Sequence, residues 1–294
     1  MFNLSQKIKK YISLKYNNGI LRIKLKLKLN KEPINTLLET RLAETKNEIK
    51  AAQQLRYRVF YKELSAHPNM ITRFTRRDKD AYDKICQHML VIDKRNKKRG
   101  VPLIGKQREK VVGTYRLLPQ RTAQENRGFY SQDEFDLLPL LEKYPEKKFL
   151  ELGRSCVLQT YRKKSTIELL WKGVWKYIQE NDFDVMIGCA SFQCNDPSEI
   201  ALPLSFLHHY CMAPNEWMVS ALPSRYTDMN LIEKENINTK DALKMLPPLI
   251  KGYLRLGAYI GDGAVIDKQF GTIDVFVIFP KDKIEKRFVD KFTI

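Results

Sequence analysis

The sequence predicts an α/β fold with a mixed central sheet, built as one domain that carries a basic N-terminal extension. Strand-like apolar runs alternate with helix-like segments along the chain, which is typical of a sheet flanked by helices. With 294 residues and 43% hydrophobic composition, the chain is long enough to bury a sizeable core. No apolar run approaches the length of about 18 residues that a membrane-spanning helix needs, so none is predicted.

The first half of the chain is expected to contribute three strands and one long helix. Residues 44–64 place apolar side chains at helical spacing, and residues 65–84 read as a charged insert with turn residues. Apolar runs predict strands at residues 37–43, 86–93 and 111–118, and a basic loop joins the last two.

The second half alternates strands and helices after a polar excursion. The expected segments are a short helix near residues 132–142, a strand at 149–158, a helix at 165–181, a strand at 185–192, a helix starting at 203–210, irregular or helical structure at 222–246, and further regular elements at 249–256 and 273–279. Gly257, Gly261 and Gly263 match neither a dinucleotide fingerprint nor a P-loop, and are expected at turns.

Residues 1–35 are expected to form a basic arm ahead of a globular part at residues 36–294. Residues 1–31 contain nine Lys or Arg and no acidic residue, and from Leu21 apolar and cationic side chains alternate with period two, which predicts a strand. Either the basic face is solvated, on an edge strand or a mobile arm, or it contacts an anionic bilayer. The arm lacks the continuous apolar stretch of a secretory signal.

The composition indicates a reduced, cytosolic protein with anionic partners. The 52 basic residues exceed the 34 acidic ones by 18, and such a surface attracts an acidic protein, an anionic membrane or nucleic acid. The five cysteines are an odd number without a CxxC pair, so free thiols are expected. His88, His208 and His209 lack the spacing of a metal site, and no metal is expected.

The stretch around Glu151 carries the clearest chemical signal. An apolar run holds Glu151 and Arg154, a basic turn follows at residues 162–164, and an amphipathic helix begins at Ser165 or Thr166. Loop amides and the positive end of a helix dipole bind phosphate groups. An acid and an arginine on the preceding strand can handle an amine and a carboxylate. The pattern therefore indicates acyl transfer from a phosphopantetheine thioester to an amine.

The order of elements, with a basic turn between a central strand and a helix, resembles the GCN5-related N-acetyltransferase (GNAT) fold. That superfamily usually carries a Gln/Arg-x-x-Gly-x-Gly/Ala phosphate loop. The matching residues 162–167 read Arg-Lys-Lys-Ser-Thr-Ile, with the arginine in place and both glycines absent. The resemblance implies a mixed, mainly antiparallel sheet flanked by helices. The missing glycines make a plain coenzyme A enzyme less expected.

Several longer blocks follow one another in a specific order: residues 55–60 (LRYRVF), 80–83 (DAYD), 86–88 (CQH), 111–118 (VVGTYRLL), 128–136 (GFYSQDEFD), 151–157 (ELGRSCV), 188–192 (GCASF) and 246–267. Together they resemble the bacterial ornithine N-acyltransferases, which make lyso-ornithine lipid. A more distant resemblance, to acyl-homoserine lactone synthases, rests on Arg56, Phe60, Asp80, Asp83, Arg116, Glu151 and Arg154. Both families move acyl groups from acyl carrier protein to an amino-acid-like amine.

Glu151 is the predicted catalytic residue, accepting the amine proton directly or through water. The alternative is a structural ion pair with Arg154. On an ideal strand, residues three apart point to opposite faces, so a direct pair needs a bulge near Gly153.

The other predicted site residues bind substrate or carrier. Asp80 and Asp83 bind the cationic groups of ornithine, or form a solvated acidic turn. Arg56 and Arg116, with Arg154, bind the substrate carboxylate; alternatively, Arg56 and Arg116 tie the loop of Asp80 and Asp83 to the sheet. The contacts to the phosphopantetheine phosphate or the carrier fall on Arg162, Lys163, Lys164, Ser165 and Thr166.

The resemblance implies an enzyme that moves a (3R)-hydroxyacyl group from acyl carrier protein to the α-amino group of L-ornithine. No permanently bound cofactor is expected, because the co-substrate is the acyl-phosphopantetheine of the acidic carrier. The expected location is cytoplasmic, peripheral at an anionic inner-membrane surface. Alternatives are an acyl-homoserine lactone synthase or another N-acyl amino acid synthase. A more remote one is a basic nucleic-acid-binding protein, although no such motif is present.

Overall fold

The computed structural model describes residues 10–17, 20–27, 37–94 and 110–284. The chain divides into two compact units, Met1–Leu38 and Glu39–Ile294. In the first unit, β1 (Lys10–Asn17) pairs antiparallel with β2 (Ile20–Leu27). The strand predicted from the alternation after Leu21 is confirmed. The predicted bilayer contact concerns side chains outside the described residues.

The second unit is built on a mixed sheet of ten strands. The strands follow one another across the sheet in the order β3 (Leu38–Leu42), β4 (Gln87–Asp93), β5 (Lys110–Pro119), β7 (Phe149–Val157), β8 (Val185–Phe192), β12 (Thr272–Pro280), β11 (Tyr259–Asp267), β9 (Ser220–Ala221) and β6 (Phe135–Asp136), with β10 (Tyr226–Thr227) pairing with β11. Among the strand pairs with a described register, β7–β8 and β9–β11 are parallel and the others are antiparallel. The mixed, mainly antiparallel sheet is therefore confirmed.

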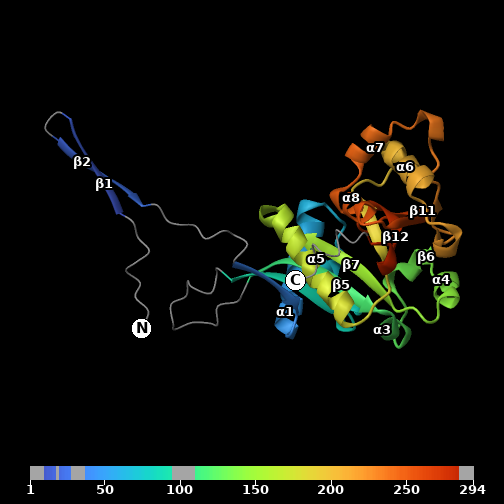
Figure 1. Cartoon of the computed structure of the whole chain (residues 1–294). Helices are drawn as coiled ribbons and strands as arrows, with labels where there is room; N and C mark the ends of the chain where they lie inside the picture. Colours follow the sequence, from blue (N-terminus) through green and yellow to red (C-terminus); the bar gives the residue numbers. More distant parts are fainter. Residues whose placement is uncertain (1–9, 18–19, 28–36, 95–109, 285–294) are drawn as a thin grey trace. The chain divides into compact units, whose positions relative to one another are not determined.

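The second unit also contains eight α-helices in the part that the structure describes. They are α1 (Lys46–Arg56), α2 (Met70–Thr75), α3 (Gln120–Gln124), α4 (Leu138–Lys143), α5 (Lys164–Glu180), α6 (Ala201–Cys211), α7 (Thr239–Met245) and α8 (Pro248–Arg255). Of these, α1, α3, α5, α6 and α8 contact the strands of the sheet. Figure 1 shows α5 lying across the sheet near β5, and α6, α7 and α8 gathered near β11 and β12.

Helices α1 and α5 cover opposite faces of β5. Tyr115 and Arg116 are consecutive on this strand and so point to opposite faces. The Tyr115 ring meets Trp171 of α5, whereas Arg116 faces Asp83, which binds Arg56 of α1. Both helices begin and end near the positions predicted from the sequence. Helix α1 begins at a capping box of Thr45 and Glu48 and continues as π-helical turns over Tyr57–Glu63.

Two expectations for secondary structure are wrong. The short helix expected near residues 132–142 is instead a 3₁₀ turn (Tyr130–Asp133), the strand β6 and the helix α4, which has a proline in its first turn. Gly257 lies in the turn that follows α8, as predicted, but Gly261 and Gly263, which were also expected at turns, lie in strand β11. Its register with β12 shifts between Ile260 and Ala264, and Gly263 lies in this bulge with φ of 75°. The bulge interrupts the alternation of side chains by which a strand is predicted from sequence.

Candidate active site

A cavity of about 450 Å³ lies where β7 and β8 separate. The two strands pair over three residues, from Phe149 to Glu151, and then diverge. Gly188 lies next to this point, and a Cβ there would sit 2.3 Å from the carbonyl oxygen of Leu152, so the strands could not approach each other with a larger residue. Beyond Glu151, backbone groups on the β8 side of β7 have no strand partner in this sheet.

The cavity has an apolar wall and a polar wall. Side chains from α5 and α8 contribute to the apolar wall, including Ile167, Leu170, Trp171, Leu249 and Tyr253. The polar wall comes from β5, β7, β8 and the turn between β11 and β12, and includes Arg116, Glu151, Arg154, Ser191, Asp267, Thr272 and Asp274. A long apolar lining with a few convergent polar groups is typical of a pocket for an amphiphilic ligand.

Glu151 is a buried carboxylate held by three hydrogen bonds. The backbone N–H of Tyr130 donates to Oε2 at 2.8 Å, while Ser131 donates to Oε1 from its N–H at 2.8 Å and its hydroxyl at 2.6 Å. Burial raises the pKa of Glu151, although the bonds from Ser131 and Tyr130 oppose this effect. A fixed carboxylate with a raised pKa at the end of a pocket has the properties of a general base.

A direct ion pair between Glu151 and Arg154 does not form. The bulge that such a pair needs is present, since Thr114 faces Cys156 and Arg116 faces Gly153, which gives β7 one extra residue. Arg154 takes a left-handed conformation there, with φ of 53°. Its guanidinium instead pairs with Asp78 and Asp80 and lies over the rings of Tyr130 and Phe270.

Three of the predicted substrate-binding residues form a buried charge network beside the cavity and do not line it. Arg56 is fully buried, with its Nε 2.8 Å from Asp78 and its Nη1 2.8 Å from Asp83. Arg116 contacts Asp80 at 2.6 Å and Asp83 at 3.7 Å. Arg56, Asp80 and Asp83 therefore interact with other residues of the protein and do not line the cavity, and their contact with substrate stays a prediction.

This network keeps its carboxylates ionised. Burial alone would favour the neutral form of Asp80, but Arg116 and Arg154 hold the pKa of Asp80 at about 2. The pKa of Asp83 is lowered in the same way, by Arg56 against the effect of burial. The alternative in which Arg56 and Arg116 tie this loop to the sheet is the one favoured by the structure. Arg116 and Arg154 also line the cavity and remain candidates for binding a substrate carboxylate.

The basic turn before α5 lies at the rim of the cavity. Arg162 lines the cavity, donates from Nε to the carbonyl of Val157 at 2.9 Å and pairs with Glu63. Lys163 is the N-cap residue of α5, a helix of 17 residues, and its side chain makes no capping hydrogen bond to the first turn. Lys164 is exposed. Thr166 is buried, and its contact with the phosphopantetheine phosphate or the carrier stays a prediction.

The cysteines do not form a nucleophilic centre. All five are free, and Cys156 and Cys189 line the cavity. Burial raises the pKa of Cys156 to about 12, and burial with neighbouring acids raises the pKa of Cys189 well above its usual value. Neither thiol forms a thiolate near neutral pH, which a nucleophile would need to do.

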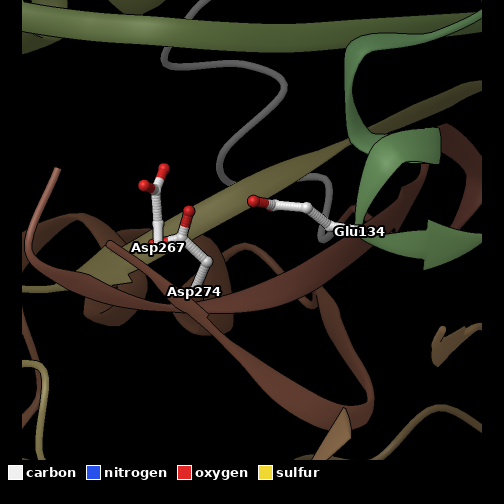
Figure 2. Close-up of side chains that lie close together, drawn as sticks. All are labelled: Glu134, Asp267 and Asp274. Carbon is white, nitrogen blue, oxygen red and sulfur yellow. The ribbon is translucent and has the colours of Figure 1, made fainter. Parts of the chain in front are cut away.

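The sequence analysis did not single out three further carboxylates, Glu134, Asp267 and Asp274, called here the acidic trio. Figure 2 shows the three carboxyl groups facing one another, with Asp267 and Asp274 on the hairpin of β11 and β12 and Glu134 just before β6. One oxygen from each lies within 4.8 Å of the others. The available signal was the presence of Glu134 and Asp267 inside the family-like blocks 128–136 and 246–267.

The sheet, the separated central strands and the cavity between them define an acyltransferase of the GNAT class, and a profile of the acetyltransferase (GNAT) domain matches residues 55–172. Over 255 residues the chain is 50% identical to the L-ornithine N(alpha)-acyltransferase of Agrobacterium fabrum, covering 87% of this chain and 85% of that protein. The Brucella abortus enzyme of the same name is also 50% identical, with 88% of it covered. The chain belongs to the L-ornithine N(alpha)-acyltransferase family.

Among solved structures, a CoA-dependent acyl-homoserine lactone synthase aligns over 87% of each chain, at 12% identity and a TM-score of 0.45.

Proposed function

We propose that this ornithine N-acyltransferase takes a (3R)-hydroxyacyl group from acyl carrier protein and places it on the α-amino group of L-ornithine, the first step of ornithine lipid biosynthesis. Its relatives bear the name L-ornithine N(alpha)-acyltransferase. The observation that carries the proposal is the position of Glu151, which lines a large and mainly apolar cavity and is the last residue of β7 that pairs with β8 before the strands separate.

Glu151 acts as the base. The α-ammonium group of the substrate passes a proton to this carboxylate, directly or through water, and the amine then attacks the thioester carbonyl. The tetrahedral intermediate is stabilised by backbone N–H groups at the strand separation. When it collapses, the C–S bond breaks, an amide forms, and the pantetheine thiol leaves with a proton. No cofactor is required, because the thioester is already activated and positioning supplies much of the rate.

The charges near the cavity support the assignment of the substrate groups. Arg154 and Arg116 line the cavity and are the candidates for binding the α-carboxylate of ornithine. Arg56, Asp80 and Asp83 hold these two arginines in place through the buried network.

Residues at the rim of the cavity support the assignment of acyl carrier protein as the acyl donor. The uncapped N-terminus of α5 and the exposed cations Lys163 and Lys164 favour a phosphate group and an acidic partner, which are the features of a phosphopantetheinylated carrier. The hydroxyacyl chain would extend along the apolar wall of α5 and α8.

The location is proposed to be the cytoplasmic surface of the inner membrane, because the product is a lipid. Among the described residues, no helix is both long enough and apolar enough to span a membrane. The nine basic residues of the N-terminal arm fit an anionic surface.

The direct test is a reaction of the purified chain with 3-hydroxyacyl carrier protein and a panel of amines, followed by mass spectrometry of the products. We expect an amide on the α-nitrogen of ornithine. A product with another amine, and none with ornithine, would reject the substrate assignment. A lactone product from S-adenosylmethionine would favour an acyl-homoserine lactone synthase instead.

The carrier assignment needs its own comparison. Replacing Lys163 and Lys164 by glutamate reverses two exposed charges and should raise KM for the carrier-bound donor about tenfold, because complementary charges steer such encounters. An unchanged KM for the carrier-bound donor would remove these lysines from the docking surface.

A further inference from the structure

The acidic trio lies on one face of the sheet, at the polar wall of the cavity. In the hairpin of β11 and β12, Asp267 is directly opposite Thr272, and Asp274 is one pair further along the same face. Ser191 of β8 is directly opposite Asp274. Four of these groups, Asp267, Thr272, Asp274 and Ser191, line the same cavity as Glu151 and Arg154.

Two buried polar atoms at this place have no partner within the described part of the chain. Asp274 is 8% exposed and no hydrogen bond reaches its Oδ1. Thr272 is 3% exposed and its Oγ1 likewise makes no hydrogen bond of normal geometry, although its hydroxyl is near enough to the Asp274 carboxyl to oppose the rise in the pKa of that group. Buried polar groups in folded proteins are nearly always satisfied, so these two atoms indicate a ligand that completes the site.

The other two carboxyl groups also retain an oxygen for a ligand. Asp267 uses Oδ1 to accept from the backbone N–H groups of Gln269 at 2.8 Å and Phe270 at 3.0 Å, which leaves Oδ2. Glu134 contacts Arg225 through Oε1 at 3.2 Å, while its Oε2 has a thiol contact with Cys189 at 3.6 Å.

The basic residues around the acidic trio do not fully balance the negative charge of its three carboxyl groups. Burial, with the neighbouring carboxylates of Asp274 and Asp267, raises the pKa of Glu134 to about 7. Burial likewise raises the pKa of Asp274 to about 6, although Ser191 and Thr272 oppose the effect. The cation that contacts Glu134, Arg225, is nearly half exposed, so a bound cation would relieve the remaining repulsion.

The dimensions of the trio fit a primary ammonium group. A nitrogen at the centre of three oxygens that are 4.8 Å apart would lie about 2.8 Å from each of them, the length of a charge-assisted N–H···O bond. An ammonium group has three N–H donors, one for each carboxylate.

We propose that Glu134, Asp267 and Asp274 bind the δ-ammonium group of ornithine and make the enzyme selective for a diamino acid. This inference rests on the proposed function, and it replaces the role that the sequence suggested for Asp80 and Asp83. A side-chain ammonium held by three carboxylates stays protonated and cannot attack the thioester. The α-amine, which loses its proton more readily, is then the group that is acylated.

The test compares ornithine with norvaline, which has the same carbon chain and lacks the δ-amine. Wild-type enzyme should favour ornithine in kcat/KM by about 10²-fold, the scale of a charged hydrogen-bonded contact. Asp267→Asn keeps an oxygen that can accept from the backbone N–H groups of Gln269 and Phe270. We expect this variant to reduce the preference for ornithine at least about tenfold, through a higher KM for ornithine. Its kcat/KM for norvaline should not change. Asp274→Asn should act in the same way.

Asp262→Asn is the matched control. Asp262 is on the same strand, accepts from Tyr226 at 3.2 Å and does not line the cavity, so its variant should keep the wild-type preference. Equal losses on ornithine and norvaline in the trio variants would overturn the inference. So would a loss of activity in chelator that added Mg²⁺ or Ca²⁺ restores, since the trio would then be a metal site.

Calorimetry of ornithine binding separates this inference from the proposed function. If wild-type enzyme binds ornithine at least about tenfold more tightly than Asp267→Asn does but forms no amide, the trio is supported and the donor assignment fails. If amide forms while both proteins bind ornithine equally, the trio is rejected and the proposed function stands.

A separate surface, helix α2, exposes three large apolar side chains. Met70 is 88% exposed, Ile71 73% and Phe74 91%. Arg73 and Arg76 are exposed beside them. Asp78, the single acidic residue between positions 64 and 79, is buried, so the surface is both apolar and cationic.

We infer that α2 inserts into the surface of an anionic lipid bilayer. Apolar side chains that enter the boundary of headgroups and acyl chains, surrounded by arginines, are the features of an interfacial membrane contact. This surface is also near the cavity in the sequence. Leu64, a few residues before α2, is partly exposed and lines the cavity. A lipid product could therefore leave toward the bilayer.

Sedimentation of the full chain with vesicles tests this contact. Ile71→Ser with Phe74→Ser should lower binding to phosphatidylcholine vesicles containing phosphatidylglycerol at least about tenfold, whereas Leu243→Ser, at an apolar position on α7 that is 45% exposed, should not. Unchanged vesicle binding would reject the inference. Unchanged vesicle binding with lost affinity for acyl carrier protein would assign the surface to the carrier.

Discussion

Removal of the Ser131 hydroxyl, one of the three hydrogen-bond donors to Glu151, tests whether this carboxylate is the base. In Ser131→Ala, the hydrogen bond of 2.6 Å to Oε1 is lost, while the two backbone N–H bonds at 2.8 Å remain. Ser131 is fully buried, and alanine fits its space, so the fold should change little.

The direction and size of the effect follow from the bond that is lost. Burial already raises the pKa of Glu151 against the hydrogen bonds that favour its charged form, so removing one donor raises that pKa further. A hydrogen bond to a charged group contributes about 1.5–3 kcal/mol, which corresponds to a change in acid dissociation of at least about tenfold. Because the base acts when ionised, activity is lost on the acid side of the profile and recovers at higher pH.

The assay is kcat/KM for ornithine as a function of pH, for wild type and Ser131→Ala. On the acid limb we expect the variant to be about tenfold less active at a given pH, and on the plateau the two should converge. Ser205→Ala is the control, because Ser205 is an equally buried serine that donates to Met229. An acid limb that stays in place, or a loss that is equal at every pH, would refute the assignment of Glu151.

Four further substitutions test the site and its support. Glu151→Gln should lower turnover at least about 10²-fold with an unchanged circular dichroism spectrum, and wild-type turnover would contradict its role. Arg56→Met leaves two buried carboxylates without their partner and should cost about 3–5 kcal/mol in urea unfolding. Gly188→Ala places a Cβ against backbone and should lower stability by about 1–3 kcal/mol, measured in the same way. Cys156→Ala should retain activity within about threefold, since a thiol with a pKa of about 12 is no nucleophile; loss of the acyl-transfer step alone would contradict this.

The regular elements with strong periodicity were predictable from the sequence. Strand β8 has the predicted bounds, and β4, β5, β7 and α5 lie within a few residues of theirs, because long apolar runs and an amphipathic pattern depend on local chemistry. Strand β11 was not predictable, because its glycines allow a bulge at Gly263 and obscure the alternation.

The site was predictable only in part. Glu151 and Arg154 were found because they lie in one apolar run, but their partners come from elsewhere in the chain. Ser131 and Tyr130 hold Glu151 from 20 or more residues away, and Asp80 reaches Arg154 across 74 residues. Such contacts depend on how distant segments pack, so sequence spacing gave no indication of them.

The sequence by itself determined the class of chemistry: an acid and an arginine on a central strand, followed by a basic turn and a helix N-terminus. The tertiary structure decided which charges are free to act. It pairs Arg56 with Asp78 and Asp83, none of which lines the cavity, and it brings Glu134, Asp267 and Asp274 together. The physical reason is that a charge taken out of water must find a partner, and only the folded chain shows whether that partner is another residue or a ligand.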